Sequence, residues 1–556
     1  MSSMPPRSVG TPASPWSTRR LALAVALFVA LAMALTWPQA THMASHTIDS
    51  DDALLSIWRM QWIAHQLPRH PLELWDGNIF YPERRTLSYS DAVMLPTLAA
   101  APLAWCGLNR VLSYNVVLLA GIVLSGVTMF FLVRDLTGAT AAGVFAGVVF
   151  AFAPYRLDHI GHLELQHAWA MPLALWALER VLRTGKIIDG VWTGLGVAAQ
   201  ALCSLYYGIF FATYLVVVGP FLFAAAHRAA RRHAIMGLLC GGVVAAALLL
   251  PYARPYLESR GEVGDRQIRE ISAYSATWAD FLATPPTNAL YRASIGTWGR
   301  AERRLFPGAA VVLVSLLALW PPWSWRRAGH GVGLLFAIEA ARGYQGWLYP
   351  WLHAFVLPYH GLRVPARFGM LMLLSLAVLG GYGVARLVTF ARRPAWRHAI
   401  GVAAVALLVV EYRSQPLPLV SVPAVPPAVY TWLAAQPPAV VLELPVPTAD
   451  RLDFFYDGWY MYYSTFHWQR LVNGYSGFYP PSFLLMLDAL RTFPDEASLA
   501  QLRKRDVSLL VLHAGNYAEP GQYADVVASV LGRTDLRFVG RFAEPGGGAV
   551  VFALTR

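Results

Sequence analysis

Runs of about 20 apolar residues recur along the first three quarters of the chain, and they constrain its fold more than any other feature. A helix of that length spans the hydrocarbon core of a bilayer. The composition agrees, because 56% of the 556 residues are hydrophobic and only 14% are charged. We therefore expect an α-helical polytopic membrane protein with about 11 transmembrane helices, at Leu21–Trp37, Val111–Val133, Ala141–Ala153, Leu165–Leu182, Ile187–Ser204, Leu205–Ala226, Ala234–Tyr252, Ala309–Trp320, Gly331–Ala341, Phe368–Phe390 and Ala399–Val410.

The basic residues between these runs predict how the chain crosses the membrane. Arginine and lysine are retained in cytoplasmic loops, and all the basic clusters share the side of the N-terminus if Val93–Leu108 does not cross. Pro96 and Pro102 inside that stretch favour a juxtamembrane or re-entrant segment, and Trp347–Val356, with Pro350, is interpreted in the same way. The formal net charge of +12 then reflects topology and indicates no nucleic-acid partner.

This topology gives a domain organisation and a location. Residues 1–18, rich in serine and proline, are expected to form a disordered cytoplasmic tail. Residues 19–412 form the membrane domain, with outer loops 41–92 and 254–307, and residues 413–556 form an extracytoplasmic α/β domain. The expected location is the bacterial inner (cytoplasmic) membrane, crossed several times, with the N-terminus in the cytoplasm.

The first outer loop carries an acidic cluster just beyond the first span: Asp49, Asp51 and Asp52. An amphipathic helix is expected over 52–67, with Trp58 and Trp62 on one face. One interpretation is that an aspartate caps this helix and the tryptophans anchor it at the membrane interface. The other is that Asp52 or Asp51 is a general base, since a cap needs only one acid.

The same loop continues with further polar residues, among them Glu83 and Arg84, which follow a rigid Tyr81–Pro82 turn. A second polar constellation, FAPYRLDHIGHLELQ, lies in a short outer turn between two spans. Its chemistry-bearing residues are Asp158, His159, His162 and Glu164, and either 158 and 162 or 159 and 162 could share a helix face. They could recognise sugar hydroxyls, hold a metal or form an interfacial turn without a role.

The stretch HGLRVPARFGMLMLL places Arg363 and Arg367 on either side of Pro365 at the outer start of a span. Proline suits the first turn of a helix, and a helix N-terminus beside arginine suits a phosphate. The alternative is that both arginines meet lipid headgroups. Arg300, Arg303 and Arg304 are weaker candidates of the same kind.

The C-terminal region reads as a small α/β domain. AVVLELPVP, VSLLVLHAG and AVVFALTR predict strands, and Val429–Ala435, Phe483–Arg491 and Asp525–Leu531 predict helices. The aromatic-rich stretch FFYDGWYMYYSTFHWQRLVNGYSGFYPP could stack on sugars, but core packing or docking onto the membrane domain is the favoured interpretation. Its polar candidates, with the preceding strand, are Glu443, Asp457 and His467.

Several of these segments together resemble the GT-C superfamily of polytopic glycosyltransferases, which includes protein mannosyltransferases and lipid A aminoarabinose transferases. The resemblance covers roughly residues 20–410. It rests on the acids after the first span, on RDLTG, and on AFAPYR with acids after it. Five further segments look like a bacterial branch of the superfamily: DALLSIW, FYPERRTLSYSD, HLELQ, LRVPARFG and NGYSGFYPP. One departure is the missing Asp-Glu pair, since Asp51-Asp52-Ala53 stands in its place.

The resemblance implies transfer of a sugar, with inversion, from a polyprenyl-phosphate donor to an acceptor outside the membrane. Asp52, or else Asp51, would be the base, and a divalent ion (Mg or Mn) is a possible cofactor. The expected acceptor- or sugar-binding residues are Asp158, His159, His162, Glu164, Tyr81 and Glu83, and the expected phosphate-binding residues are Arg363, Arg367 and Arg84.

The expected partners are a polyprenyl-phosphate-linked sugar, the lipid bilayer, and a glycan, lipid or protein acceptor. Two other classes stay open: a transporter or flippase of a lipid-linked saccharide, and a membrane scaffold without catalysis. A transporter would need polar residues deep in the spans, where Gln200 and Glu339 are the main ones. A scaffold would tolerate alanine at the loop acids.

Overall fold

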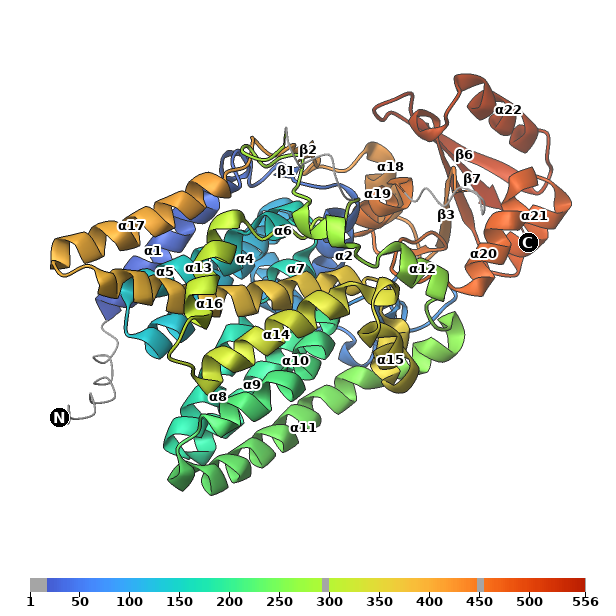
Figure 1. The fold of residues 1–556 in the computed structure, drawn as a ribbon. Helices are drawn as coiled ribbons and strands as arrows, with labels where there is room; N and C mark the ends of the chain where they lie inside the picture. The colour runs from blue at the N-terminus through green and yellow to red at the C-terminus, as the bar shows by residue number, and fades with distance from the viewer. Residues whose placement is uncertain (1–17, 293–299, 448–454, 556) are drawn as a thin grey trace, which may run out of the picture. The chain divides into compact units, whose positions relative to one another are not determined.

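The computed structural model describes residues 18–292, 300–447 and 455–555. These fall into two compact units (Figure 1). The first unit comprises residues up to 41, 118–250 and 265–417, and the second comprises 42–117, 251–264 and 418–556. The predicted disordered tail, up to residue 17, lies outside the described residues.

The first unit is built of helices, most of them apolar. Their bounds are α1 Thr18–Leu35, α5 Thr140–Phe152, α6 Pro154–Asp158, α7 Leu163–Gln166, α8 Ala170–Thr184, α9 Ile187–Cys203, α10 Leu205–Ala224, α12 Ile268–Ala273, α13 Ala309–Leu319, α14 Trp325–Ala341, α15 Leu348–Phe355, α16 Gly369–Phe390 and α17 Pro394–Glu411. Helices α4 Arg110–Thr137 and α11 Arg231–Val263 contribute residues to both units. The core of this unit is α16, which is buried along nearly its whole length and packs against α5, α13 and α14.

Seven helical segments among the described residues are long and apolar enough to cross a membrane. The other expected spans correspond to the shorter helices α8, α9, α13 and α14. The chain is therefore a multi-pass membrane protein. The two segments interpreted as non-crossing form short helices, α3 Met94–Trp105 and α15, and neither is among the seven.

The second unit combines the first loop with the C-terminal region. Its helices are α2 Asp51–Gln66, α3, α18 Ala428–Ala434, α19 Phe455–Ser464, α20 Pro481–Ala489, α21 Glu496–Arg503 and α22 Pro520–Leu531. Its strands are β1 His46–Thr47, β2 Val420–Ser421, β3 Val440–Leu444, β4 Arg470–Leu471, β5 Leu509–His513, β6 Leu536–Phe542 and β7 Ala549–Leu554. The predicted α/β character of residues 413–556 is confirmed.

The main sheet has the strand order β4-β3-β5-β7-β6, with β4, β3 and β5 parallel and β7 and β6 antiparallel. Its strands β3, β6 and β7 are labelled in Figure 1. Val441, Leu510 and Val551 lie in its fully buried centre. The first loop packs against this region. Strand β1 pairs with β2, in the register His46 to Ser421, and α2 packs against α19.

Candidate functional site

The predicted polar turn consists of two short helices, α6 and α7, between α5 and α8. Pro154 occupies the first position of α6, where its missing N–H costs nothing. The buried Arg156 guanidinium braces the turn by donating to the carbonyls of Leu165 and Gln166, at 2.7 and 3.0 Å. The idea that 158 and 162, or 159 and 162, share one helix face is wrong, because the helix breaks between residues 158 and 163.

Glu302 gathers the residues of this turn instead. Arg367 donates to its two carboxylate oxygens through Nη2 at 2.7 Å and Nε at 3.1 Å. His159 Nε2 lies 3.1 Å from the same carboxylate, and His162 Nε2 lies 3.4 Å away. Four side chains from three separate stretches of the first unit thus converge, and we call them, with Glu164, the Glu302 cluster.

Glu164 lies at the edge of this cluster, and Asp158 lies beside it. Glu164 lies 3.8 Å from Arg367 Nη1 and 4.0 Å from His162 Nδ1. Asp158 accepts a hydrogen bond from Arg304 at 3.0 Å. The first unit therefore brings Asp158, His159, His162, Glu164 and Arg367 close together, as residues of one polar site should be.

Burial alone would raise the pKa of Glu302. Arg367 and then His159 outweigh it, so the pKa lies well below its usual range. Glu302 also has a φ of 70°, in the left-handed region that a residue with a side chain rarely adopts. Such strain persists only where the surroundings impose it, and here the surroundings are the cations that the carboxylate meets.

Glu302 is the functional candidate that the sequence interpretation missed. It lies in the basic stretch RAERRLFPG, whose arginines Arg300, Arg303 and Arg304 are the weaker phosphate-binding candidates of the sequence analysis. The one sequence feature that could have identified Glu302 is its position as the single acidic residue among these arginines. Its partner Arg367 is 65 residues away, and no spacing rule joins them.

The two predicted phosphate-binding arginines of the first unit differ in what they contact. The donor fork of Arg367 is occupied by Glu302, and its side chain is only 7% exposed. Arg363 lies 3.5 Å from Glu270, and its side chain is 37% exposed. Pro365 begins a short 3-10 helix over Pro365–Phe368 that leads into α16, as expected for proline at a helix start. Of the two arginines, Arg363 is the one that a ligand can reach without breaking a buried ion pair.

Asp51 and Asp52 open α2 in the second unit, and both are half-buried. Their charge complements the positive end of the helix dipole. The Ser50 hydroxyl donates to Asp51 at 2.9 Å and makes no cap hydrogen bond. The expectation that an aspartate caps this helix is wrong, because Ser50 is the N-cap residue and both acids lie in the first helical turn. The base interpretation stays a prediction.

The expected interfacial anchor on α2 is wrong, because both tryptophans are buried within the second unit. Trp58 Nε1 donates to Asn78 Oδ1 and Trp62 Nε1 donates to the carbonyl of Leu74, each at 2.9 Å. Nearly every residue of α2 after its first turn is buried. Helix α2 is thus part of the core of the second unit, and Asp51 and Asp52 in its first turn are partly exposed.

The loop after α2 docks onto the C-terminal region of the same unit. The backbone N–H of Tyr81 donates to the carbonyl of Leu471 at 2.9 Å, and the Ser482 hydroxyl donates to Glu83. Arg84 is exposed. The sugar-binding role of Tyr81 and Glu83 and the phosphate-binding role of Arg84 stay predictions.

Among the described residues, no group of three His, Cys, Asp or Glu side chains could hold a metal ion. His159 and His162 instead face Glu302 beside a guanidinium, which repels a cation. These residues do not fit the divalent ion that the resemblance allowed.

The polar candidates of the C-terminal region form a buried network at the ends of β3 and β5. Tyr430 donates to Glu443 at 2.6 Å, and His513 bridges Glu443 and Glu544, at 2.9 Å from each. We call these four residues, with Asp457, the Glu443 cluster. Burial raises the pKa of Glu443 and that of Asp457, the latter to about 8. His467 is buried too, and burial lowers its pKa to about 3.

The aromatic-rich stretch packs inside the second unit. Tyr460 and Tyr462 are buried, Tyr462 donates to the carbonyl of Pro423, and Arg110 lies 3.7 Å from the ring centroid of Phe466. The core interpretation of these aromatics is confirmed for the residues that the structure describes, which begin at Phe455 in this stretch.

Comparison with solved structures identifies similar folds. ArnT from Cupriavidus metallidurans in the apo state has a TM-score of 0.50 and 13% identity, covering 96% of this chain and 98% of that one. The same protein bound to undecaprenyl phosphate has a TM-score of 0.49 and 12% identity, covering 97% and 98%. The oligosaccharyltransferase AglB from Archaeoglobus fulgidus, in complex with an inhibitory peptide and a dolichol-phosphate, has a TM-score of 0.46 and 11% identity, covering 96% and 74%.

No protein-family model matches the chain, and no curated protein matches it. The structural likeness nevertheless extends over nearly the full length of both chains in the ArnT comparison. The chain therefore shares its overall fold with ArnT.

Proposed function

We propose that the protein is a membrane glycosyltransferase that moves a sugar, with inversion, from a polyprenyl-phosphate donor to an acceptor on the extracytoplasmic side. The observation that carries the proposal is the Glu302 cluster, because Glu302, Arg367 and His159 form a charged group at the ends of membrane helices. Ionisable groups at such a place are costly and mark a substrate site by default. The GT-C fold supports the same function by analogy.

In the proposed reaction, Asp52, or else Asp51, removes the proton of the acceptor hydroxyl as its oxygen attacks the anomeric carbon. The bond from that carbon to the phosphate oxygen breaks, and the lipid phosphate leaves with the electron pair. Because this leaving group is already a stable anion, no general acid is needed. Arg363 is the cation that we assign to the developing charge.

The Glu302 cluster has a different role in this proposal. Arg367 is already paired with Glu302, so it would hold the carboxylate and the two histidines in place rather than grip the phosphate. His162 is the more exposed histidine, with 22% of its side chain accessible against 3% for His159. We therefore assign sugar-hydroxyl contact to His162, Glu164 and Asp158, and a positioning role to His159 and Glu302.

The test uses the full chain in proteoliposomes with undecaprenyl phosphate carrying radiolabelled glucose, mannose or arabinose. The readout is release of undecaprenyl phosphate when membrane extract supplies the acceptor. Asp52→Asn and Asp51→Asn, singly and together, should lower the rate by about 100-fold or more for the residue that is the base. Asp525→Asn, at an exposed position of α22, is the matched control. Full activity of the double variant would exclude both acids as the base.

The transporter alternative depended on Gln200 and Glu339 as polar residues lining a path through the spans, and their contacts give it little support. Gln200 donates to the carbonyl of His167, and Glu339 pairs with Arg342 and accepts from the N–H of Trp347. These hydrogen bonds stabilise the fold locally. Release of undecaprenyl phosphate without transfer of the label would favour a hydrolytic reaction, and label crossing the membrane on an intact donor would favour transport.

A further inference from the structure

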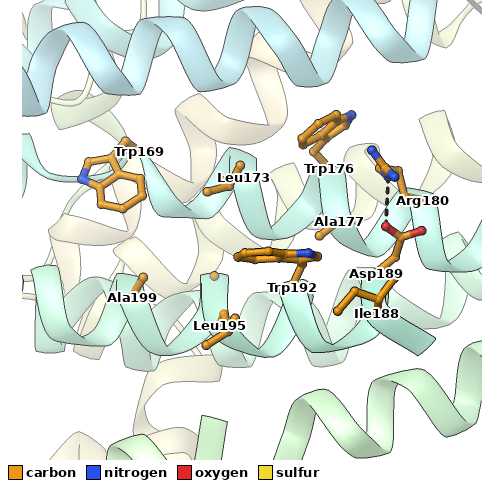
Figure 2. A pocket seen from close by; sticks show the side chains of 11 residues that line it. Trp169, Leu173, Trp176, Ala177, Arg180, Ile188, Asp189, Trp192, Leu195 and Ala199 are labelled. Atoms are coloured by element: carbon orange, nitrogen blue, oxygen red, sulfur yellow. Dashed lines mark hydrogen bonds and ion pairs between the residues drawn. The ribbon is translucent and has the colours of Figure 1, made fainter. Parts of the chain in front are cut away.

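An apolar groove with a volume of about 520 Å³ lies between α8 and α9 of the first unit (Figure 2). Trp169 and Trp176, at the start and middle of α8, and Trp192 on α9 line it. The groove extends from residue 169 to residue 180, which is roughly 17 Å along a helix. That length is close to the hydrocarbon depth of one leaflet, roughly 15 Å.

Close helix packing fixes the shape of the groove. A side chain on Gly190 or Gly194 of α9 would collide with the backbone of Gly237 or Gly241 of α11. These glycines therefore let α9 and α11 touch through their backbones. Since α9 is held on that side, its opposite face, with the 57% exposed Trp192, stays open toward the groove.

One end of the groove holds three basic residues, Arg180, Arg183 and Lys186, of which Arg180 is paired with Asp189 and Arg183 with Asp135. Arg180 donates from Nε to Asp189 at 3.1 Å and lies 5.2 Å from the ring centroid of Trp176 (Figure 2). Its terminal nitrogens make no hydrogen bond to the described residues, and 40% of the side chain is exposed. Arg183 and Lys186, both exposed, follow on the same turn and loop. Arg180 thus offers free donors at the end of an apolar channel.

We propose that this groove binds an anionic phospholipid, with an acyl chain along Trp169 and Trp192 and the phosphate at Arg180. Basic pockets between membrane helices suit acidic headgroups. The groove is apolar along nearly its whole length and about one leaflet deep, which suits an acyl chain.

The lipid site is separate from the transfer site. Helix α7, which ends next to the Glu302 cluster, precedes α8, and Arg180 lies roughly 15 Å further along α8. By the charge pattern, Arg180 belongs to the cytoplasmic side, opposite the proposed transfer. The occupant is therefore a phospholipid of the inner leaflet and not the sugar donor, and the inference does not depend on the chain being a transferase.

Native mass spectrometry of the detergent-purified full chain tests this, with phosphatidylglycerol and phosphatidylcholine of identical acyl chains as probes. The parent should bind phosphatidylglycerol more tightly. Arg180→Gln should weaken phosphatidylglycerol binding about fivefold and phosphatidylcholine binding less, because the choline cation offsets the phosphate charge. Leu195→Trp, which fills the groove, should weaken both lipids. Arg393→Gln, an exposed arginine outside the groove, is the matched control and should change neither.

Equal binding of the two lipids by the parent would overturn the proposal. So would equal behaviour of Arg180→Gln and Arg393→Gln, or undecaprenyl phosphate competing at the Arg180 site more strongly than phosphatidylglycerol. If Leu195→Trp does not fold, Ala199→Phe fills the other end of the groove. Retained binding of both lipids in a folded groove-filling variant would contradict it equally.

Discussion

Each unit contains a carboxylate that meets a histidine, largely buried in Glu302 and fully buried in Glu443, yet the two carboxylates behave in opposite ways. Glu302 in the first unit faces Arg367 and has a pKa well below its usual range. Glu443 in the second unit faces His513 and Tyr430, and burial raises its pKa. The difference is the guanidinium, which no described residue supplies to Glu443.

The Glu302 cluster therefore keeps its charges over a wide pH range, whereas the Glu443 cluster gains or loses protons. Arginine is always protonated, so Glu302 stays charged across the working pH range. In the Glu443 cluster, burial opposes the charge of His513, but the hydrogen bonds that its ring donates to Glu443 and Glu544 outweigh burial and raise the pKa of His513 to about 9. Only the first kind suits a site that must meet a phosphate-linked sugar in one charge state.

Removing the Arg367 guanidinium removes the difference between the two carboxylates, and we expect it to have the largest effect on the free energy of unfolding. Arg367→Gln leaves Glu302 buried without its main counter-ion and should lower the free energy of unfolding by about 3–5 kcal/mol. Arg367→Lys keeps the charge and should lose less. Chemical unfolding in detergent micelles measures this, with Arg393→Gln as the exposed control. If all three variants are equally stable, Arg367 does not compensate Glu302.

A smaller effect should follow at the edge of the same cluster. Arg304 donates to Asp158 at 3.0 Å, but both side chains are more exposed than Arg367. Arg304→Gln should therefore cost about 1.5 kcal/mol, the low end for a hydrogen bond to a charged group. The same unfolding experiment checks it. If Arg304→Gln lowers the free energy of unfolding as much as Arg367→Gln does, burial does not determine how much each ion pair stabilises the fold.

The Glu443 cluster should make stability depend on pH. The folded pKa of Asp457, about 8, lies above its ordinary value of 3.8, and that of His513, about 9, lies above 6.5. The folded state therefore binds more protons, and stability is lost as the pH rises through these values. Asp457→Asn should flatten the decline between roughly pH 4 and 8 by up to ~1.4 kcal/mol per pH unit. Unfolding curves at several pH values measure it.

The control for this pH dependence is Asp525→Asn, because Asp525 is exposed on α22. It should keep the slope of the parent. An unchanged slope in Asp457→Asn, or stability that increases with pH in the parent, would contradict the assignment of a raised pKa to Asp457.

The sequence predicted the elements that depend on local pattern. Apolar runs predicted the membrane helices, and the β-branched runs around Val441, Val511 and Val551 predicted β3, β5 and β7. Strand β6 was missed because Arg537, Arg541 and several exposed positions interrupt its apolar pattern at the sheet edge. Edge strands have one unpaired side, so their residues need not be hydrophobic.

The site was predictable only in part, because its residues meet through tertiary contacts. The acids and histidines of the α6–α7 turn stand close in sequence, so their proximity could be inferred. Glu302 reaches His159 across 143 residues, and no periodicity links them. The pattern of Trp58 and Trp62 allowed an anchor at the membrane interface, because a helix pattern does not reveal whether its apolar face meets lipid or protein, and both side chains are buried.

The most direct measurement is label transfer from undecaprenyl-phosphate-linked sugar by Asp52→Asn, Asp51→Asn and the double variant, beside Asp525→Asn, in proteoliposomes. We predict that the double variant folds, binds the donor and loses transfer by about 100-fold or more, with the parent product inverted at the anomeric carbon. Transfer by the double variant at the parental rate, or a parent that releases free sugar and never glycosylates an acceptor, would contradict the assignment.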